Sequence, residues 1–85
     1  MFYYVYILQG SKNFYVGFTA DLKKRVNQHN TNKNFSTKNR GPWKLIFYES
    51  YLNKYDALRR EKYLKSTKGK TTIRSMLREY LSNPE

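Results

Sequence analysis

Alternating aromatic and aliphatic residues mark three segments of the chain that are typical of β-strands. The first two, residues 2–8 and 14–18, are separated by the turn-forming sequence Gln-Gly-Ser-Lys-Asn at 9–13, which predicts a β-hairpin. A third strand is predicted at residues 43–51. The polar stretch at 31–42 is rich in Asn, Thr and Lys and is typical of a loop.

Three helices are predicted between and after these strands. Thr19 can cap the first helix, which runs to about Asn30, and Asn53 can cap the second, at residues 54–65. The second helix should end near the Lys-Gly-Lys sequence that follows it. An amphipathic third helix is expected at residues 71–81.

The resulting order of elements is β-β-α-β-α-α. This order predicts an α+β fold in which helices flank a three-stranded sheet. With 85 residues, the chain is long enough for one small domain with a modest core. We expect residues 1–82 to form this single domain and residues 83–85 to form a tail.

The charge balance of the chain indicates a class of binding partner. Seventeen Lys and Arg residues against six Asp and Glu give a net charge of +11, which favours a polyanion, most commonly a nucleic acid. An anionic membrane surface is the alternative, but the sequence has no basic amphipathic helix with a bulky apolar face. Aromatic residues make up 18% of the chain, which indicates a folded domain rather than a disordered one.

Several classes of site and location are excluded by composition. The chain has no cysteine and one histidine, so we expect no disulfide, no thiolate or His-rich metal site and no Cys nucleophile. No apolar run approaches the roughly 20 residues of a membrane span. The N-terminus lacks the basic region and cleavage site of a signal peptide. We therefore expect a cytoplasmic protein with no membrane partner and no small-molecule cofactor.

Ionisable residues interrupt the apolar sides of the first two helices. On a helical wheel, Arg25 and His29 share the side of Leu22 and Val26, and Glu61 lies within the apolar stripe of the second helix. Buried polar groups are costly without a partner or ligand. A structural Arg25–Glu61 ion pair and a functional pocket both explain this pattern, and the residues alone favour neither.

The tyrosines and the histidine have a structural interpretation of their own. Tyr6 and Tyr15 lie in predicted strands, where tyrosines commonly fill a half-buried sheet face. A single His29 is more often a hydrogen-bonded structural residue than a catalyst. Gly17 fits either a strand end or a close approach of another group to the backbone.

Two tripeptides, Tyr4-Val5-Tyr6 and Tyr15-Val16-Gly17, resemble the two signature tripeptides of the GIY-YIG nuclease superfamily. The similarity continues through T-x-D-L-x-x-R-x-x-x-H at 19–29, through Gly-Pro-Trp-Lys-Leu at 41–45 and through A-x-x-x-E-x-x-x-K at 57–65. It covers nearly the whole chain and is greatest to the short bacterial single-domain members.

This resemblance implies an α/β sandwich with a central three-stranded antiparallel sheet, and hydrolysis of DNA phosphodiesters with one Mg²⁺ or Mn²⁺ ion. Tyr6 would activate or position the attacking water, with Tyr15 hydrogen-bonded beside it. Arg25 would bind the scissile phosphate, and His29 would orient or relay protons. Glu61 would be the single protein ligand of the metal.

The sequence also departs from the family pattern. Gly17 is retained and would keep the floor of the cleft open, but Tyr4 replaces the first glycine, and Val replaces both central isoleucines. Many family members carry an Asn after the metal-binding Glu, whereas no Asn occurs between Lys62 and Ser82 here. This last difference bears on catalytic strength rather than on the fold.

Further basic residues are expected to contact DNA phosphates, which position a duplex but read little sequence. A basic run ends at Arg74, within the predicted third helix, and begins before that helix. The expected contacts are Lys12, Lys24, Lys33, Lys38, Arg40, Lys65, Lys68 and Lys70. Larger relatives carry separate domains that choose the target. Without such a domain, this chain should be structure-selective or weakly specific.

The leading hypothesis is therefore a metal-dependent DNA endonuclease that acts in DNA repair or recombination. The alternative is a nucleic-acid-binding module of the same fold with little or no turnover. A third, weaker interpretation is a structural partner in a repair complex, with the tyrosine-rich surface as its interface. The sequence leaves open the DNA substrate, the group that activates water, the oligomeric state and any partner protein.

Overall fold

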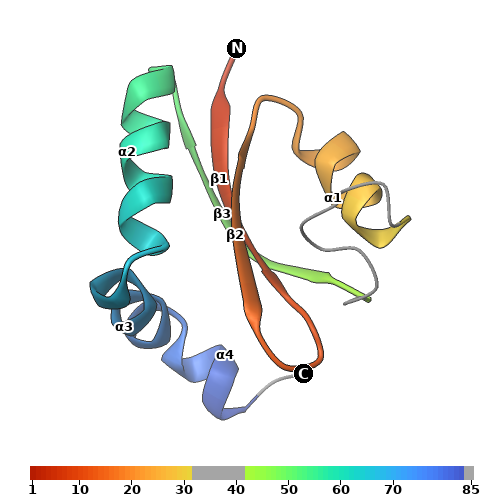
Figure 1. The fold of residues 1–85 in the computed structure, drawn as a ribbon, viewed down its shortest axis with the longest axis vertical. Coiled ribbons are helices and arrows are strands. Elements are labelled where there is room, and N and C mark those ends of the chain that lie inside the picture. Colours follow the sequence, from red (N-terminus) through yellow and green to blue (C-terminus); the bar gives the residue numbers. More distant parts are fainter. Residues whose placement is uncertain (32–41, 84–85) are drawn as a thin grey trace.

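The computed structural model describes residues 1–31 and 42–83. Its helices flank a three-stranded antiparallel sheet of order β2-β1-β3, as the sequence predicts. Helix α1 lies on one face of the sheet, and α2 and α3 lie on the other (Figure 1). The elements are β1 (Tyr3–Gln9), β2 (Phe14–Thr19), α1 (Leu22–Asn30), β3 (Lys44–Tyr51), α2 (Lys54–Leu64), α3 (Thr67–Met76) and α4 (Arg78–Ser82).

The N-terminal hairpin forms as predicted. The Gly10 amide donates to the Asn13 carbonyl over 2.9 Å, which closes the turn between β1 and β2. Tyr6 pairs with Gly17 on β2 and with Tyr48 on β3, so β1 is the central strand. The pairing of β1 with β3 shifts register between Ile7 and Leu8. The ladder is therefore irregular close to Tyr6.

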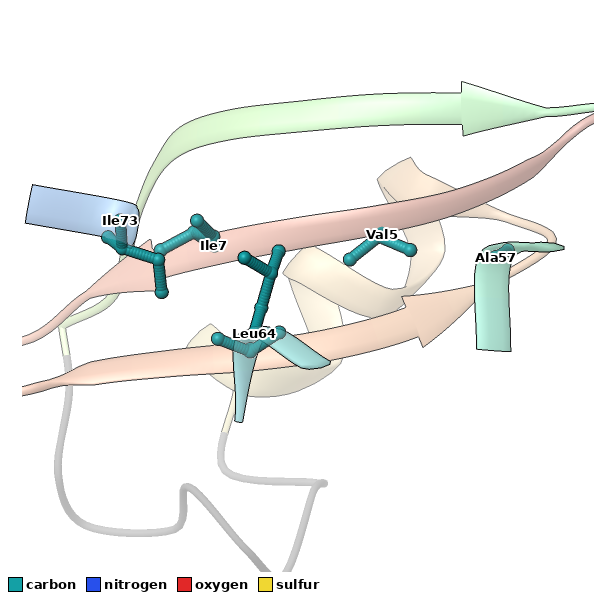
Figure 2. Close-up of a cluster of buried hydrophobic side chains, with 6 residues drawn as sticks. Val5, Ile7, Ala57, Leu64 and Ile73 are labelled. Atoms are coloured by element: carbon teal, nitrogen blue, oxygen red, sulfur yellow. The ribbon is translucent and has the colours of Figure 1, made fainter. Parts of the chain in front are cut away.

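Strand β1 supplies side chains to two separate cores because both of its faces are covered. Val5 and Ile7 pack with Ala57, Leu64 and Ile73 on the side of α2 and α3 (Figure 2). The intervening residues of β1 turn to the other face. There they join a second cluster that contains Tyr6, Leu8 and Trp43, with Leu22 and Val26 of α1 packed against it. Strand β1 therefore contributes to a hydrophobic cluster on each face of the sheet.

The C-terminal helices differ from the sequence prediction. The expected single helix at 71–81 is wrong, because α3 begins at Thr67 and ends at Met76, and α4 begins at Arg78. Gly69 lies inside α3 rather than at a stop, because the Ser66 hydroxyl accepts from its amide and caps the helix. The helix is interrupted at Leu77, whose side chain packs against the core on the α2 side of the sheet.

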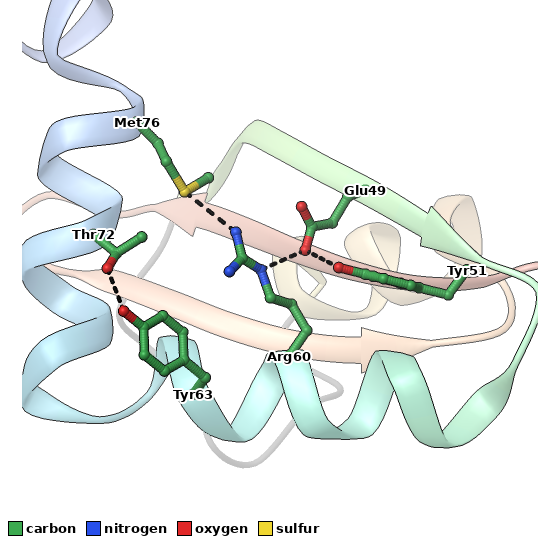
Figure 3. Close-up of polar contacts among 6 residues, drawn as sticks. All are labelled: Glu49, Tyr51, Arg60, Tyr63, Thr72 and Met76. Carbon is green, nitrogen blue, oxygen red and sulfur yellow. Dashed lines mark hydrogen bonds and ion pairs between the residues drawn. The ribbon is translucent and has the colours of Figure 1, made fainter.

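A polar cluster fastens α2 to β3. Arg60 Nε donates to Glu49 Oε1 over 2.7 Å, and the Tyr51 hydroxyl donates to the same oxygen over 2.5 Å (Figure 3). Burial and the bond to Glu49 raise the pKa of Tyr51 to about 12. Arg60 also approaches the Met76 sulfur at 3.5 Å, so the cluster extends to the end of α3.

Within residues 1–31 and 42–83, no helix has the length and apolar character needed to cross a membrane. The expected DNA contacts Lys33, Lys38 and Arg40 lie outside the described residues.

Candidate active site

A buried tyrosine–histidine pair lies at the centre of the candidate site. Tyr6 comes from the middle of β1 and His29 from the last turn of α1, and both side chains are fully buried. The Tyr6 hydroxyl and His29 Nε2 are 2.9 Å apart and form a hydrogen bond. Helix α1 reaches this position because Leu22 and Val26 pack on the same sheet face. The polar residues on the apolar side of α1 thus face a partner in the sheet.

Tyr15 contributes its ring to the same cluster. Its ring centroid lies 4.8 Å from that of His29, and its edge contacts the ring of Trp43 at a centroid distance of 6.3 Å. The Tyr6 and Tyr15 rings are neighbours at 6.3 Å. The Tyr6 hydroxyl bonds to His29, and the expected hydrogen bond of Tyr15 beside Tyr6 stays a prediction.

Gly17 is explained by the path of the Tyr6 side chain. A Cβ atom at position 17 would lie 2.8 Å from Tyr6 Cε1 and closer still to Cζ and the hydroxyl oxygen. The two residues are register partners on β1 and β2. Tyr6 therefore crosses the edge strand at the one position where no side chain obstructs it. The close-approach interpretation of this glycine is the one that the structure supports.

The charges around Tyr6 come from two different helices. Burial and the neighbouring Tyr15 raise the pKa of Tyr6 well above its ordinary value, while the guanidinium of Arg25 beside it acts in the opposite direction. The carboxylate of Glu61, on α2, also raises the pKa of Tyr6 and so lies within its electrostatic range. Burial, assisted by Arg25, lowers the pKa of His29.

These shifts fix the ionic state of the central pair at neutral pH. A raised pKa keeps Tyr6 protonated, and a lowered pKa keeps His29 neutral. The phenol can then donate to Nε2 of an imidazole whose proton is on Nδ1. The free protein therefore presents a neutral proton donor–acceptor pair next to a guanidinium.

Glu61 does not form the ion pair that its place in the sequence had suggested. Its Oε2 lies 3.0 Å from Lys65 Nζ, one turn later on α2. Between the described residues, no ion pair joins Glu61 to Arg25, so the structural interpretation of that pair is wrong. The Glu61 side chain is 20% exposed, which leaves its carboxylate accessible from the surface.

The Glu61 carboxylate is the type of ligand that hard divalent cations prefer, and in this structure it pairs with Lys65. In the described part of the chain, no group of three or more His, Cys, Asp or Glu side chains is placed to hold a metal ion. A metal at Glu61 would take its other ligands from water and substrate phosphate oxygens. That set suits Mg²⁺, which usually keeps several waters and binds one or two carboxylates.

The predicted DNA-contacting lysines separate into two groups. Lys12 lines one cleft of about 530 Å³ together with Lys65 and Lys70, which are more than 50 residues away in the sequence. Lys24 is exposed on α1, on the other face of the sheet, and Lys68 is exposed on α3 but does not line the cleft. The structure thus brings together part of the expected phosphate-binding set.

One contact that supports the site is not predictable from the sequence. The side chain of Asn30 donates to the Trp43 carbonyl over 2.9 Å and accepts from the Trp43 amide over 2.7 Å. This two-bond clip holds Trp43 against Tyr15. No sequence spacing indicates it, because it joins the end of a helix to the residue before a strand. The only sequence signal is that Trp43 is the single tryptophan of the chain.

Comparison with known proteins gives consistent matches. The family model described as the GIY-YIG catalytic domain matches residues 2–74. UPF0213 protein CPE1444 of Clostridium perfringens is 42% identical over 64 residues, which are 73% of this chain and 69% of that protein. A UPF0213 protein of Limosilactobacillus reuteri is 43% identical over 67 residues, or 74% of this chain and 70% of that protein.

A solved structure matches the fold as well. The solution NMR structure of UPF0213 protein BH0048 from Bacillus halodurans aligns with a TM-score of 0.57 at 32% identity. The alignment covers 89% of this chain and 85% of that chain. The predicted fold class is confirmed by this match and by the sheet topology.

Proposed function

Because the chain belongs to the GIY-YIG catalytic domain family, a family of nucleases, we propose that it is a divalent-metal-dependent endonuclease that hydrolyses DNA phosphodiesters. One observation carries the proposal. The hydroxyl of Tyr6 bonds to His29 of α1. It lies within electrostatic range of Tyr15 of β2, Arg25 of α1 and Glu61 of α2. These are the residue types that phosphodiester hydrolysis needs for proton transfer, charge neutralisation and metal binding.

In this proposal, the chain's own residues divide the chemistry between them. Arg25 binds the scissile phosphate and stabilises the negative charge that grows on its oxygens. Glu61 would hold one Mg²⁺ or Mn²⁺ ion. That ion would supply charge neutralisation and would lower the pKa of a water bound to it. Tyr15 packs against His29 and keeps the imidazole aligned with Tyr6.

The Tyr6–His29 pair moves the proton of the attacking water. As the water oxygen bonds to phosphorus, its proton passes to the Tyr6 oxygen, and the Tyr6 proton passes to His29 Nε2. The phosphorus–oxygen bond to the leaving deoxyribose breaks, and that oxygen takes a proton from solvent. This relay suits a tyrosine whose pKa is raised, because Tyr6 never has to exist as a free phenolate.

Cleavage assays with one matched pair of variants test the proposal. Purified wild type, Glu61→Gln and Glu79→Gln are incubated with labelled duplex, single-stranded, flapped and branched DNA, with Mg²⁺ or Mn²⁺ and with EDTA. Glu79 is a suitable control because its side chain is 94% exposed and lies on α4. We expect metal-dependent cutting that falls by at least about a hundredfold in Glu61→Gln and stays near wild type in Glu79→Gln. Equal cutting by Glu61→Gln and wild type would refute the assignment.

The absence of an Asn between Lys62 and Ser82 favours a second candidate, a DNA-binding module with little turnover. It predicts salt-sensitive binding that is equal with and without Mg²⁺, and no cutting of any substrate in the panel. In the leading proposal, the protein acts in the cytoplasm on repair or recombination intermediates. The preferred substrate in the same assay tests that role.

A further inference from the structure

A basic cleft lies between the β1–β2 turn and the junction of α2 with α3. Its volume is about 530 Å³, which is in the range of pockets that hold a nucleotide-sized ligand. Cations reach its border from three elements, and none of the described residues that line it is acidic. These cations are Lys12, Lys65, Lys70 and Arg74.

The inner surface of the cleft has a different character from its border. Phe14 of β2, with Leu64 and Ile73 of the two helices, gives it an apolar and partly aromatic wall. An aromatic ring can stack against any nucleobase, and surrounding cations bind the phosphate. A solvated basic surface would need neither the hollow nor this wall. The combination therefore fits a nucleoside monophosphate unit better than a bare anion.

The cleft adjoins the candidate active site at two points. Tyr15 lines the cleft, and its ring lies 4.8 Å from that of His29. Lys65 also lines the cleft, and its ammonium lies 3.0 Å from the Glu61 carboxylate. A nucleotide in the cleft would thus be a direct neighbour of a phosphate held between Arg25 and Glu61.

We propose that this cleft is a nucleotide subsite, which seats the nucleotide adjacent to the scissile phosphodiester. Its base lies against Phe14, and its phosphate lies among Lys12, Lys70 and Arg74. Binding in the cleft stands on the observations above, whereas its place next to the cleaved bond rests on the proposed function. A free nucleotide and a nucleotide within a DNA strand both present a base and a phosphate, and we assign the cleft to the DNA strand.

The binding test uses isotope-labelled protein in metal-free buffer with EDTA. Thymidine 5′-monophosphate, inorganic phosphate, thymidine and the dinucleotide TpT are titrated separately, and amide shifts are followed by NMR. We expect saturable shifts at Phe14, Val16 and Ile73 with the monophosphate. Lys70→Gln/Arg74→Gln should weaken its binding at least about tenfold, which is the effect of one lost ion pair of about 1.4 kcal/mol. The control Lys62→Gln, on α2 but outside the cleft, should change it less than about twofold.

Each other outcome of this titration overturns a stated part of the proposal. Amide shifts spread over all basic surfaces, with equal affinity in the double variant and the Lys62→Gln control, would refute a defined site. Such a result would show only a diffuse electrostatic attraction. Inorganic phosphate binding as tightly as the monophosphate would remove the role of the base. Failure of TpT to bind, while the monophosphate binds, would make the cleft a site for free nucleotides rather than for a strand.

Two further measurements separate this inference from the proposed function. Glu61→Gln should keep the metal-free binding of the monophosphate and lose cleavage. Saturable binding without any DNA cleavage by wild type would refute the proposed function and leave the cleft as a nucleotide site. Wild-type cleavage by Lys70→Gln/Arg74→Gln, with no shifts in the cleft, would refute the subsite and leave the nuclease intact.

Discussion

The close approach of Tyr6 to Gly17 makes Gly17→Ala a sharp test of how the site is built. The new methyl group would lie 2.8 Å from Tyr6 Cε1 and closer to the two atoms beyond it, where real Cβ atoms essentially never lie. Tyr6 cannot simply swing away, because it is fully buried and its hydroxyl is bonded to His29. The ring must shift, or the β1–β2 pairing must open.

The expected loss of stability has two parts. Forcing one extra carbon into a packed core costs about 1–3 kcal/mol. Loss of the hydrogen bond from Tyr6 to His29 adds about 0.5–1.5 kcal/mol. We therefore expect Gly17→Ala to lower the free energy of unfolding by roughly 2–4 kcal/mol. In a domain of this size, that corresponds to a fall in melting temperature of about 8 °C or more.

Urea unfolding followed by tryptophan fluorescence measures this loss, since Trp43 is the single tryptophan and is buried in the same cluster. The control is a double-mutant cycle with Tyr6→Leu, which removes the atoms that the methyl group would meet. In that background Gly17→Ala should cost little, which gives a coupling of at least about 1.5 kcal/mol. A coupling below about 0.5 kcal/mol would refute the steric explanation.

Three further predictions concern stability elsewhere in the chain. Since the pKa of buried His29 is lowered, only the unfolded state gains its proton as pH falls below about 6.5. The free energy of unfolding should then fall by up to about 1.4 kcal/mol per pH unit. Urea unfolding that gives the same free energy at every pH from 7 to 5 would contradict this. Arg60→Gln, which breaks the bond to Glu49, should cost about 1–2 kcal/mol in thermal unfolding, against about 0.5 or less for the exposed neighbour change Arg59→Gln. Equal losses would exclude a special role for the α2–β3 cluster. Gly69→Ala should lower stability by at least about 2 kcal/mol in circular dichroism melts, because its Cβ would lie 2.5 Å from a backbone atom of α2. Alanine has the higher helix propensity, so a gain in stability would disprove that contact.

The sequence predicted the sheet and the first two helices because local patterns determine them. Alternation in β1 and β2, the turn between them, and the cap at Asn53 act over a few residues and need no distant partner. The extent of α3 was mispredicted because it depends on tertiary contacts. Gly69 stays helical where α3 packs closely on α2, and Leu77 interrupts the helix to reach the core.

The candidate site shows the same division. The spacing of Arg25 and His29 predicted that both face the sheet, and the resemblance predicted that Tyr6, Tyr15 and Glu61 gather near them. The hydrogen-bond partners were not predictable. The bond between Tyr6 and His29 depends on where α1 sits on the sheet, and no residue pattern encodes that distance. Glu61 pairs with Lys65 for a local reason, since the two are one helical turn apart.

The clip between Asn30 and Trp43 has a consequence for protein engineering. Its two hydrogen bonds join the chain on either side of residues 32–41, so the ends of that segment are held together independently of what connects them. Each doubling of the length of a loop whose ends are held together costs only about 0.6 kcal/mol in chain entropy. We therefore expect that an insertion between positions 32 and 41 leaves the Tyr6–His29 pair in place, which the hydrogen bonds of Asn30 to Trp43 support.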